Sequence, residues 1–137
     1  WPDSYWGANV DTRVRPQDPE QVAVAIRPDY SLGSHVAPLG VDFSVPAMGA
    51  RFADGVFVGE HGRWNRNPPA GYKVVFVPFR DGRPAGEPID FVSGFHGEDG
   101  LTRGRPVGVA VDRAQPGLPL FVEPVRMRVL DRIELLF

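Results

Sequence analysis

The feature that most constrains the fold of this chain is a series of short runs rich in valine and phenylalanine, separated by glycine and proline. Gly 16 and Pro 15 together make 31 of the 137 residues, so turns recur every few residues. Short apolar runs between turn residues are typical of β-strands and predict an all-β fold. The expected strands are residues 37–44, 54–60, 72–79, 88–95, 106–112 and 118–123.

Two local patterns indicate how these strands are connected. Asp81-Gly82 has the composition of a two-residue turn and predicts a tight hairpin. The motif Pro-x-Gly-Val opens one expected strand at Pro38 and another at Pro106. Four strands followed by a strand with the same opening are the pattern of one β-propeller blade and the start of the next.

The two ends of the chain are less regular than its middle. Asp18-Pro19-Glu20 has the N-cap and first-turn proline of a short helix within an otherwise irregular segment, residues 1–34. The tail, residues 125–137, alternates as a strand does but also fits a helical stripe, and we favour the strand. We therefore expect one propeller fragment over 1–137, with a blade at 35–95 and the start of the next blade, with an atypical tail, at 96–137.

Composition excludes several classes of partner and site. Fifteen Lys+Arg against 17 Asp+Glu give a net charge of −2, too little positive charge to attract nucleic acid. The absence of cysteine excludes disulfides and thiolate metal sites. No apolar stretch approaches the ~20 residues of a membrane span. The chain begins with Trp1 rather than Met, which we interpret as a piece of a longer protein.

The loop "GEHGRWNRNPPAG" (59–71) carries more large, directional side chains than a connection between two strands needs. Together with "WPDSYWGANVDTRVRPQDPE", "RPDYSLGSHVAPLGVDF", "GYKVVFVPF" and "GRPVGVAVD", it resembles the C-terminal part of sorbosone dehydrogenase-like proteins. These are relatives of the soluble aldose (glucose and pyranose) dehydrogenases that depend on pyrroloquinoline quinone (PQQ). The resemblance covers residues 1–112. The remaining sequence lacks the family's Ala-Asp-Asp turn.

The resemblance implies a six-bladed propeller that binds PQQ and Ca²⁺ and oxidises a sugar or sugar aldehyde with the help of an electron acceptor. This chain would supply about two four-stranded antiparallel blades. The catalytic His of the family lies upstream, so the chain would contribute cofactor-binding loops and be inactive alone. The expected cofactor-binding residues are His35, His61, Trp64, Asn65, Arg66 and Arg105.

Each of these residues has a structural interpretation beside the functional one. Arg66 and Arg105 suit the PQQ carboxylates, since Arg forms charge-assisted bonds to carboxylate. Trp64 either stacks on the cofactor or caps the core. His35 and His61 either bind the quinone or substrate or stabilise their loops.

No metal site is expected within the chain itself. His35, His61 and His96 have no recognised ligand spacing, and His96 is expected at the surface.

A non-catalytic alternative remains open. The same strands suit a propeller-like binding or assembly module with a degenerate site. In either case two isolated blades leave sheet edges unpaired, so we expect the chain to need the missing blades or self-association. The resemblance implies a periplasmic or secreted parent protein.

Overall fold

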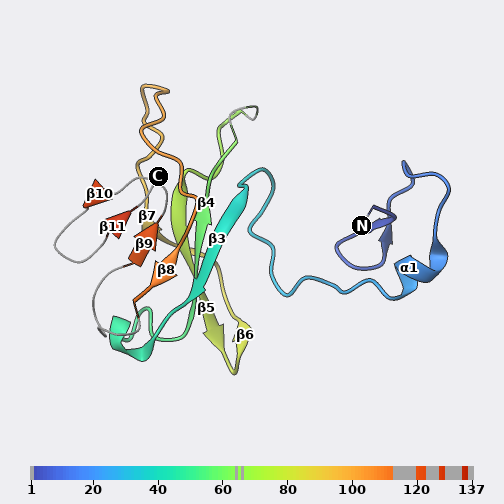
Figure 1. Cartoon of the computed structure of the whole chain (residues 1–137), viewed down its shortest axis with the longest axis horizontal. Coiled ribbons are helices and arrows are strands. Elements are labelled where there is room, and N and C mark those ends of the chain that lie inside the picture. Colours follow the sequence, from blue (N-terminus) through green and yellow to red (C-terminus); the bar gives the residue numbers. More distant parts are fainter. Residues whose placement is uncertain are drawn as a thin grey trace. The chain divides into compact units, whose positions relative to one another are not determined.

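The structure is a computed structural model, shown in Figure 1. It describes residues 2–63, 65 and 67–112, together with the strands at 120–122, 127–128 and 134–135. The chain divides into two units, Trp1–Ser31 and Leu32–Phe137.

The first unit contains a two-stranded antiparallel sheet and one helix. The elements are β1 (Ser4–Tyr5), β2 (Asn9–Val10) and α1 (Pro19–Ala23). Asp18 caps the helix, because its carboxylate accepts hydrogen bonds from the backbone N–H groups of Glu20 and Gln21, both at 3.1 Å. A proline occupies the first turn. The helix predicted from Asp18-Pro19-Glu20 is therefore confirmed.

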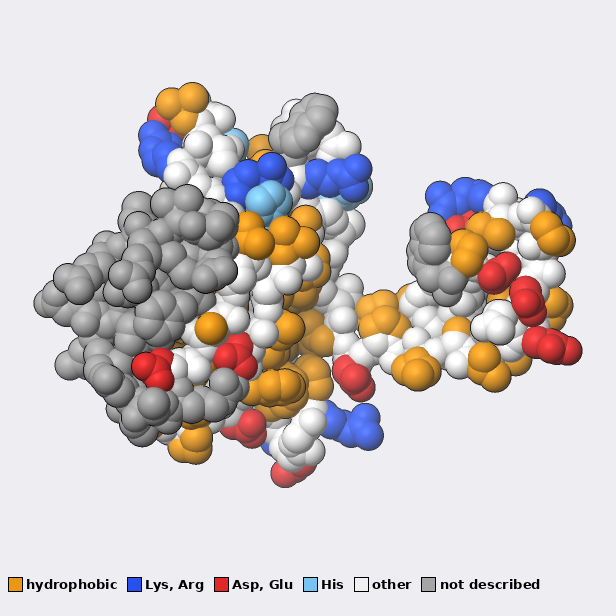
Figure 2. Space-filling model, in the orientation of Figure 1, with side chains coloured by type: hydrophobic (Ala, Val, Ile, Leu, Met, Phe, Trp, Pro, Cys, Tyr) orange, Lys and Arg blue, Asp and Glu red, His pale blue; other side chains and the backbone are white. Residues whose placement is uncertain are grey.

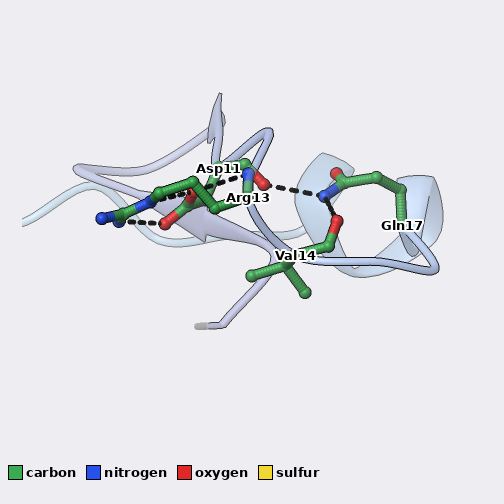
Figure 3. A network of polar contacts seen from close by, with 4 residues as sticks. All are labelled: Asp11, Arg13, Val14 and Gln17. Carbon is green, nitrogen blue, oxygen red and sulfur yellow. Dashed lines mark hydrogen bonds and ion pairs between the residues drawn. The ribbon is translucent and has the colours of Figure 1, made fainter.

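A polar network centred on Asp11 joins β2 to the approach of α1 (Figure 3). The side-chain amide of Gln17 donates to the carbonyls of Asp11 (2.8 Å) and Val14 (2.6 Å). Arg13 donates to the Asp11 carboxylate from Nε (2.8 Å) and from its backbone N–H (3.1 Å). These hydrogen bonds from Arg13 lower the pKa of Asp11 to about 2. The network therefore fixes the turn with bonds to backbone carbonyls as well as an exposed ion pair.

The second unit is built on a five-stranded antiparallel sheet. In chain order its strands are β3 (Pro38–Phe43), β4 (Gly55–Glu60), β5 (Lys73–Arg80), β6 (Arg83–Pro84) and β7 (Ile89–Val92), with the short 3₁₀ helix η1 (Pro46–Met48) after β3. The order is β3-β4-β5, with both β6 and β7 paired to β5. Asp81 (φ 53°) and Gly82 (φ 73°) are both left-handed, as a type I′ turn requires. The predicted hairpin is confirmed.

The core lies on one face of this sheet. Phe57 and Phe76 are opposite each other across β4 and β5, are fully buried, and have ring centroids 4.9 Å apart. Phe52, from the loop after η1, packs edge-on against Phe76 at 5.1 Å, and Phe91 of β7 packs against Phe57 at 4.7 Å. The contacts among these four rings, two of them fully buried and two partly buried, contribute to the stability of the unit.

A second sheet contacts the same face. Its strands are β8 (Ala110–Val111), β9 (Leu120–Val122), β10 (Met127–Arg128) and β11 (Glu134–Leu135), in the order β10-β11-β9-β8. The Val111 N–H donates to Asp42 Oδ2 of β3 at 2.7 Å. A Cβ added to Gly40 would lie 2.4 Å from the carbonyl oxygen of Val107. The two Pro-x-Gly-Val segments are thus direct neighbours (Figure 1).

The all-β prediction is confirmed, with two adjustments to the expected strands. The strand predicted at 106–112 pairs only at Ala110–Val111, because residues 106–109 lie face-on against Gly40 and Gly59 rather than in a ladder. Strands β10 and β11 agree with the favoured interpretation of the tail, and the rest of 113–137 lies outside the described residues. Among the described residues, no helix has the length and apolar character to cross a membrane.

Candidate functional site at one end of the five-stranded sheet

Three segments far apart in the sequence meet at the end of the sheet where β4 ends and β5 begins. They are the approach to β3, the turn that follows β4, and residues 105–106 before β8. Lys, Arg and His side chains gather at this end of the unit (Figure 2, upper part). Backbone and side-chain hydrogen bonds join all three segments.

The His61-Gly62 turn is held by the segment before β3. The His61 N–H donates to the carbonyl of Ala37 at 3.0 Å, and the Gly62 N–H donates to the carbonyl of Val36 at 2.8 Å. His35 comes directly before this pair and has a left-handed backbone, with φ of 66°. The chain therefore turns sharply at His35 before it runs beside the 61–62 turn.

Arg105 holds the same turn from the other side. Its Nε donates to the carbonyl of His61 at 3.1 Å, and its Nη2 donates to the carbonyl of Gly62 at 2.5 Å. In return, the imidazole Nδ1 of His61 lies 3.2 Å from the carbonyl of Pro106. We call these three contacts the 61–105 clamp. The clamp joins the end of β4 to the segment that leads into the second sheet.

Tyr72 lies under the clamp. Its side chain is 4% exposed, and a Cβ added to Gly62 would lie 2.5 Å from its ring. The Arg105 guanidinium lies 5.5 Å from the ring centroid, and the His96 ring lies 5.1 Å from it. Tyr72 itself has a left-handed backbone (φ 59°), which is costly for a residue with a side chain. The surrounding contacts hold this strained conformation in place.

Glu60, the last residue of β4, is buried beside the clamp. Its side chain is 2% exposed, and Oε2 has no hydrogen-bond partner among the described residues. Lys73 is opposite Glu60 across β4 and β5, but its ammonium group binds Asp90 at 2.6 Å. Burial raises the pKa of the Glu60 carboxyl, Lys73 opposes that shift, and Asp90 adds to it. Glu60 therefore holds its proton more tightly in the folded chain than in the unfolded one.

We expect Glu60→Gln to stabilise the chain in a pH-dependent way. The pKa of Glu60 is higher in the folded chain than in the unfolded chain, where it is about 4.3. The resulting contribution to the free energy of unfolding is therefore fully present below pH 4.3 and is lost as the pH rises through the folded-state pKa. At pH 8 the amide avoids burial of an uncompensated charge, which is worth about 1–2 kcal/mol, or roughly 4–8 °C in Tm. At pH 4 the two Tm values should converge. Thermal unfolding at both pH values measures the difference, with Glu87→Gln, at an exposed glutamate, as the matched control. An equal gain at pH 4 and pH 8 would contradict the prediction.

The structure brings some of the predicted site residues together and leaves others apart. His61 and Arg105 are in direct contact through the clamp, and His35 adjoins it through Val36. Asn65 is exposed in a turn beyond the clamp. Trp64 and Arg66 lie outside the described residues, and their assignment stays a prediction.

Three residues at this end were not expected from sequence. Tyr72 and Glu60 resemble ordinary members of their strands, and no local pattern marks either one. His96, expected at the surface, is partly exposed; its ring packs on Tyr72, and its Nδ1 lies 3.2 Å from Thr102 Oγ1. His96 and Thr102 also pair as an isolated antiparallel bridge across the 97–101 turn.

The described residues contain no group of three or more His, Asp or Glu side chains that would hold a metal ion. His61 and His96 both use Nδ1 in hydrogen bonds within the chain. What this end offers to a ligand is therefore hydrogen-bond donors and acceptors on a rigid framework.

Comparison with curated proteins finds relatives over part of the chain. A protein of Borreliella burgdorferi is 36% identical over 85 residues, which is 58% of this chain and 22% of that protein. The pyrroloquinoline quinone-dependent pyranose dehydrogenase of Coprinopsis cinerea is 45% identical over 56 residues, which is 41% of this chain and 7% of that enzyme. The chain thus spans less than a quarter of either relative.

Solved structures show the same kinship. The holo form of the pyranose dehydrogenase PQQ domain from Coprinopsis cinerea matches with a TM-score of 0.59 and 29% identity, over 84% of this chain and 31% of that one. A calcium structure of a Trichoderma reesei family AA12 carbohydrate-active enzyme matches with a TM-score of 0.54 and 20% identity. The match covers 77% of this chain and 27% of that one, and it supports the fold. The profile of one protein family matches residues 9–122. The chain belongs to the TrAA12-like family.

Proposed function

We propose that this chain is part of a quinoprotein sugar dehydrogenase, in which the 61–105 clamp forms one side of the PQQ site. The proposal is supported by membership of the TrAA12-like family and by the similarity to a PQQ-dependent pyranose dehydrogenase and to the PQQ domain of that enzyme. Sorbosone oxidation, the narrower activity of the resembled proteins, stays a prediction.

The proposal rests mainly on the hydrogen bonds that the Arg105 guanidinium makes. A guanidinium has five N–H donors, and two of them are engaged by the carbonyls of His61 and Gly62. Among the residues that the structure describes, no acceptor binds the other three donors, and two of these three lie on the edge formed by Nη1 and Nη2. That edge suits one carboxylate in a two-point contact, and PQQ carries three carboxylates. The donor set therefore fits the cofactor, and the bonds to backbone carbonyls hold the guanidinium in place before binding.

The residues of this chain would bind and orient. Bound PQQ supplies the two-electron acceptor for oxidation of a sugar, with Ca²⁺ as the accompanying ion suggested by the calcium structure of the AA12 neighbour. Arg105 would hold a carboxylate, while His35, Asn65, Trp64 and Arg66 are the further candidates around it. The base that removes the substrate proton would lie in another part of the longer protein.

The remainder of the cofactor site would come from further sheets. We infer that β3, β4, β5 and β7 form one blade and that β8 begins the next, in a propeller closed by segments outside this chain. Additional blades, or a second copy of the chain, would cover the exposed side chains of Leu39, Val41 and Phe43 on β3, which are 58%, 63% and 58% exposed. The predicted export of the longer protein follows from the same resemblance.

The test is dye-linked oxidation of pyranoses and aldoses by the longer protein, reconstituted with PQQ and Ca²⁺. We expect turnover that depends on both additions, and no turnover by the 137-residue chain alone. Inactivity of the longer protein on every sugar despite bound PQQ would favour the binding-module alternative. Turnover by the 137-residue chain would overturn the assignment of the base to another segment.

A further inference from the structure

We propose that His61 presents an unprotonated Nε2 at the clamp and accepts a hydrogen bond there from a hydroxyl group of the sugar, rather than donating one to the cofactor. The inference rests on the proposed function for the identity of the sugar. The protonation pattern of the ring rests on the structure alone.

The clamp determines which ring nitrogen carries the proton. Nδ1 of His61 lies 3.2 Å from the carbonyl oxygen of Pro106, which can only accept a hydrogen bond. Nδ1 must therefore be the donor in this contact. In a neutral imidazole the other nitrogen, Nε2, then carries a lone pair and no proton.

Arg105 and Glu60 are the charged residues that adjoin His61, the first through a hydrogen bond and the second in sequence. The guanidinium of Arg105 is bonded to the backbone carbonyl of His61 itself, which places a positive charge beside the residue. Glu60, the adjacent acid in sequence, lies on β4, where successive side chains point to opposite faces of the sheet. No ion pair of His61 is formed within the described part of the chain.

The chemistry of the ligands then decides which one Nε2 meets. Among the residues that the structure describes, none donates to Nε2, and the side chain is half-buried rather than enclosed. Quinone oxygens and carboxylates are acceptors, so a lone pair on Nε2 repels them. Sugar hydroxyls are donors. The pyrrole N–H is the donor that PQQ itself carries, and the experiment must separate it from the sugar.

Two substitutions of His61 distinguish the role of its Nδ1 from the role of its Nε2. The amide nitrogen of asparagine reaches about as far as Nδ1, so His61→Asn keeps the donor to Pro106 and removes Nε2. The longer amide of glutamine reaches about as far as Nε2, so His61→Gln restores an acceptor there and gives up the bond to Pro106.

The tautomer is tested directly on the 137-residue chain. Long-range ¹H–¹⁵N spectra of the ¹⁵N-histidine-labelled protein distinguish an imidazole protonated on Nδ1 from one protonated on Nε2 and from imidazolium. His61 is identified by the resonances that disappear in His61→Asn. We expect a neutral ring protonated on Nδ1. Either of the other two forms at pH 7.5 would overturn the inference, whatever the longer protein does.

The ligand is tested on the longer protein, with glucose as the sugar probe. Loss of one neutral hydrogen bond predicts that His61→Asn raises KM for glucose about 3- to 10-fold, with a PQQ Kd within twofold of wild type and an unchanged Tm. His61→Gln should recover part of the KM. A weakened PQQ Kd with an unchanged KM would assign Nε2 to the cofactor and overturn the proposal. Absence of PQQ binding by the wild type would instead reject the proposed function and leave the tautomer standing.

Discussion

Gly40→Ala should loosen the contact between the second sheet and the first and cost about 3 kcal/mol. A Cβ at this position would lie 2.4 Å from the carbonyl oxygen of Val107, 2.6 Å from the backbone nitrogen of Val109 and 2.8 Å from the carbonyl carbon of Gly108. All three contacts are backbone atoms, so no side-chain rotation relieves them. Overpacking that forces side chains and backbone to shift costs about 1–3 kcal/mol and occasionally more, and we place Gly40→Ala at the upper end because every close contact is a backbone atom.

Gly59→Ala is the matched control for this prediction, because Gly59 pairs with Gly40 and faces the same segment. Its added Cβ would lie 3.1 Å from Cγ2 of Val109, a side-chain atom that can move. We expect Gly59→Ala to cost less than about 1 kcal/mol. Urea unfolding gives both values, and amide exchange at Val111, which donates to Asp42, reports separation of the sheets. Equal, small effects of the two substitutions would show that the sheets are not packed as described.

Arg105→Ala should lower stability by about 2–3 kcal/mol, in addition to any effect on ligand binding. The substitution removes two charge-assisted hydrogen bonds and leaves the carbonyls of His61 and Gly62 without these donors. It also removes the cation from beside the Tyr72 ring. Thermal unfolding should show a Tm lower by roughly 8–12 °C.

Two further arginine variants show whether the geometry or the charge of Arg105 is responsible for its contribution to stability. Arg105→Lys keeps the charge but has no planar fork to reach both carbonyls, so it should restore less than half of the lost stability. Arg103→Ala removes an exposed ion pair with Asp99 and should leave Tm within about 2 °C. Full recovery of Tm in Arg105→Lys would mean that the clamp depends on charge alone.

The strands of the first sheet could be predicted from sequence because local patterns and tertiary environment agree there. "VFVGE" and "YKVVFVPF" are apolar on both faces and become the two central strands, β4 and β5. Asp81-Gly82 forms the turn that its composition indicates, because both residues tolerate positive φ. The Pro-x-Gly-Val repeat correctly indicated two equivalent segments. It did not show that its glycines mark the line where those segments touch.

The candidate site was predictable only in part, since the contacts of the 61–105 clamp join residues more than 40 positions apart. The loops at 61–66 and 105 were identified by their unusual side chains and by resemblance. That Arg105 binds backbone carbonyls of the other loop follows from the crossing of β4 and the 105–106 segment, which no local pattern encodes. Tyr72 and Glu60 were missed for the same reason: burial at the end of a sheet depends on what packs over it.

Calorimetric titration of PQQ into the longer apoprotein, in the presence of Ca²⁺, tests the central claim most directly. We expect saturable binding of PQQ to the wild type. Binding to Arg105→Lys should be at least about tenfold weaker, since a two-point contact to a carboxylate is replaced by a single one. The titration is run below the Tm of both proteins, so that folding does not limit the result. Equal PQQ affinity in the two proteins would contradict the claim that the 61–105 clamp forms part of the cofactor site.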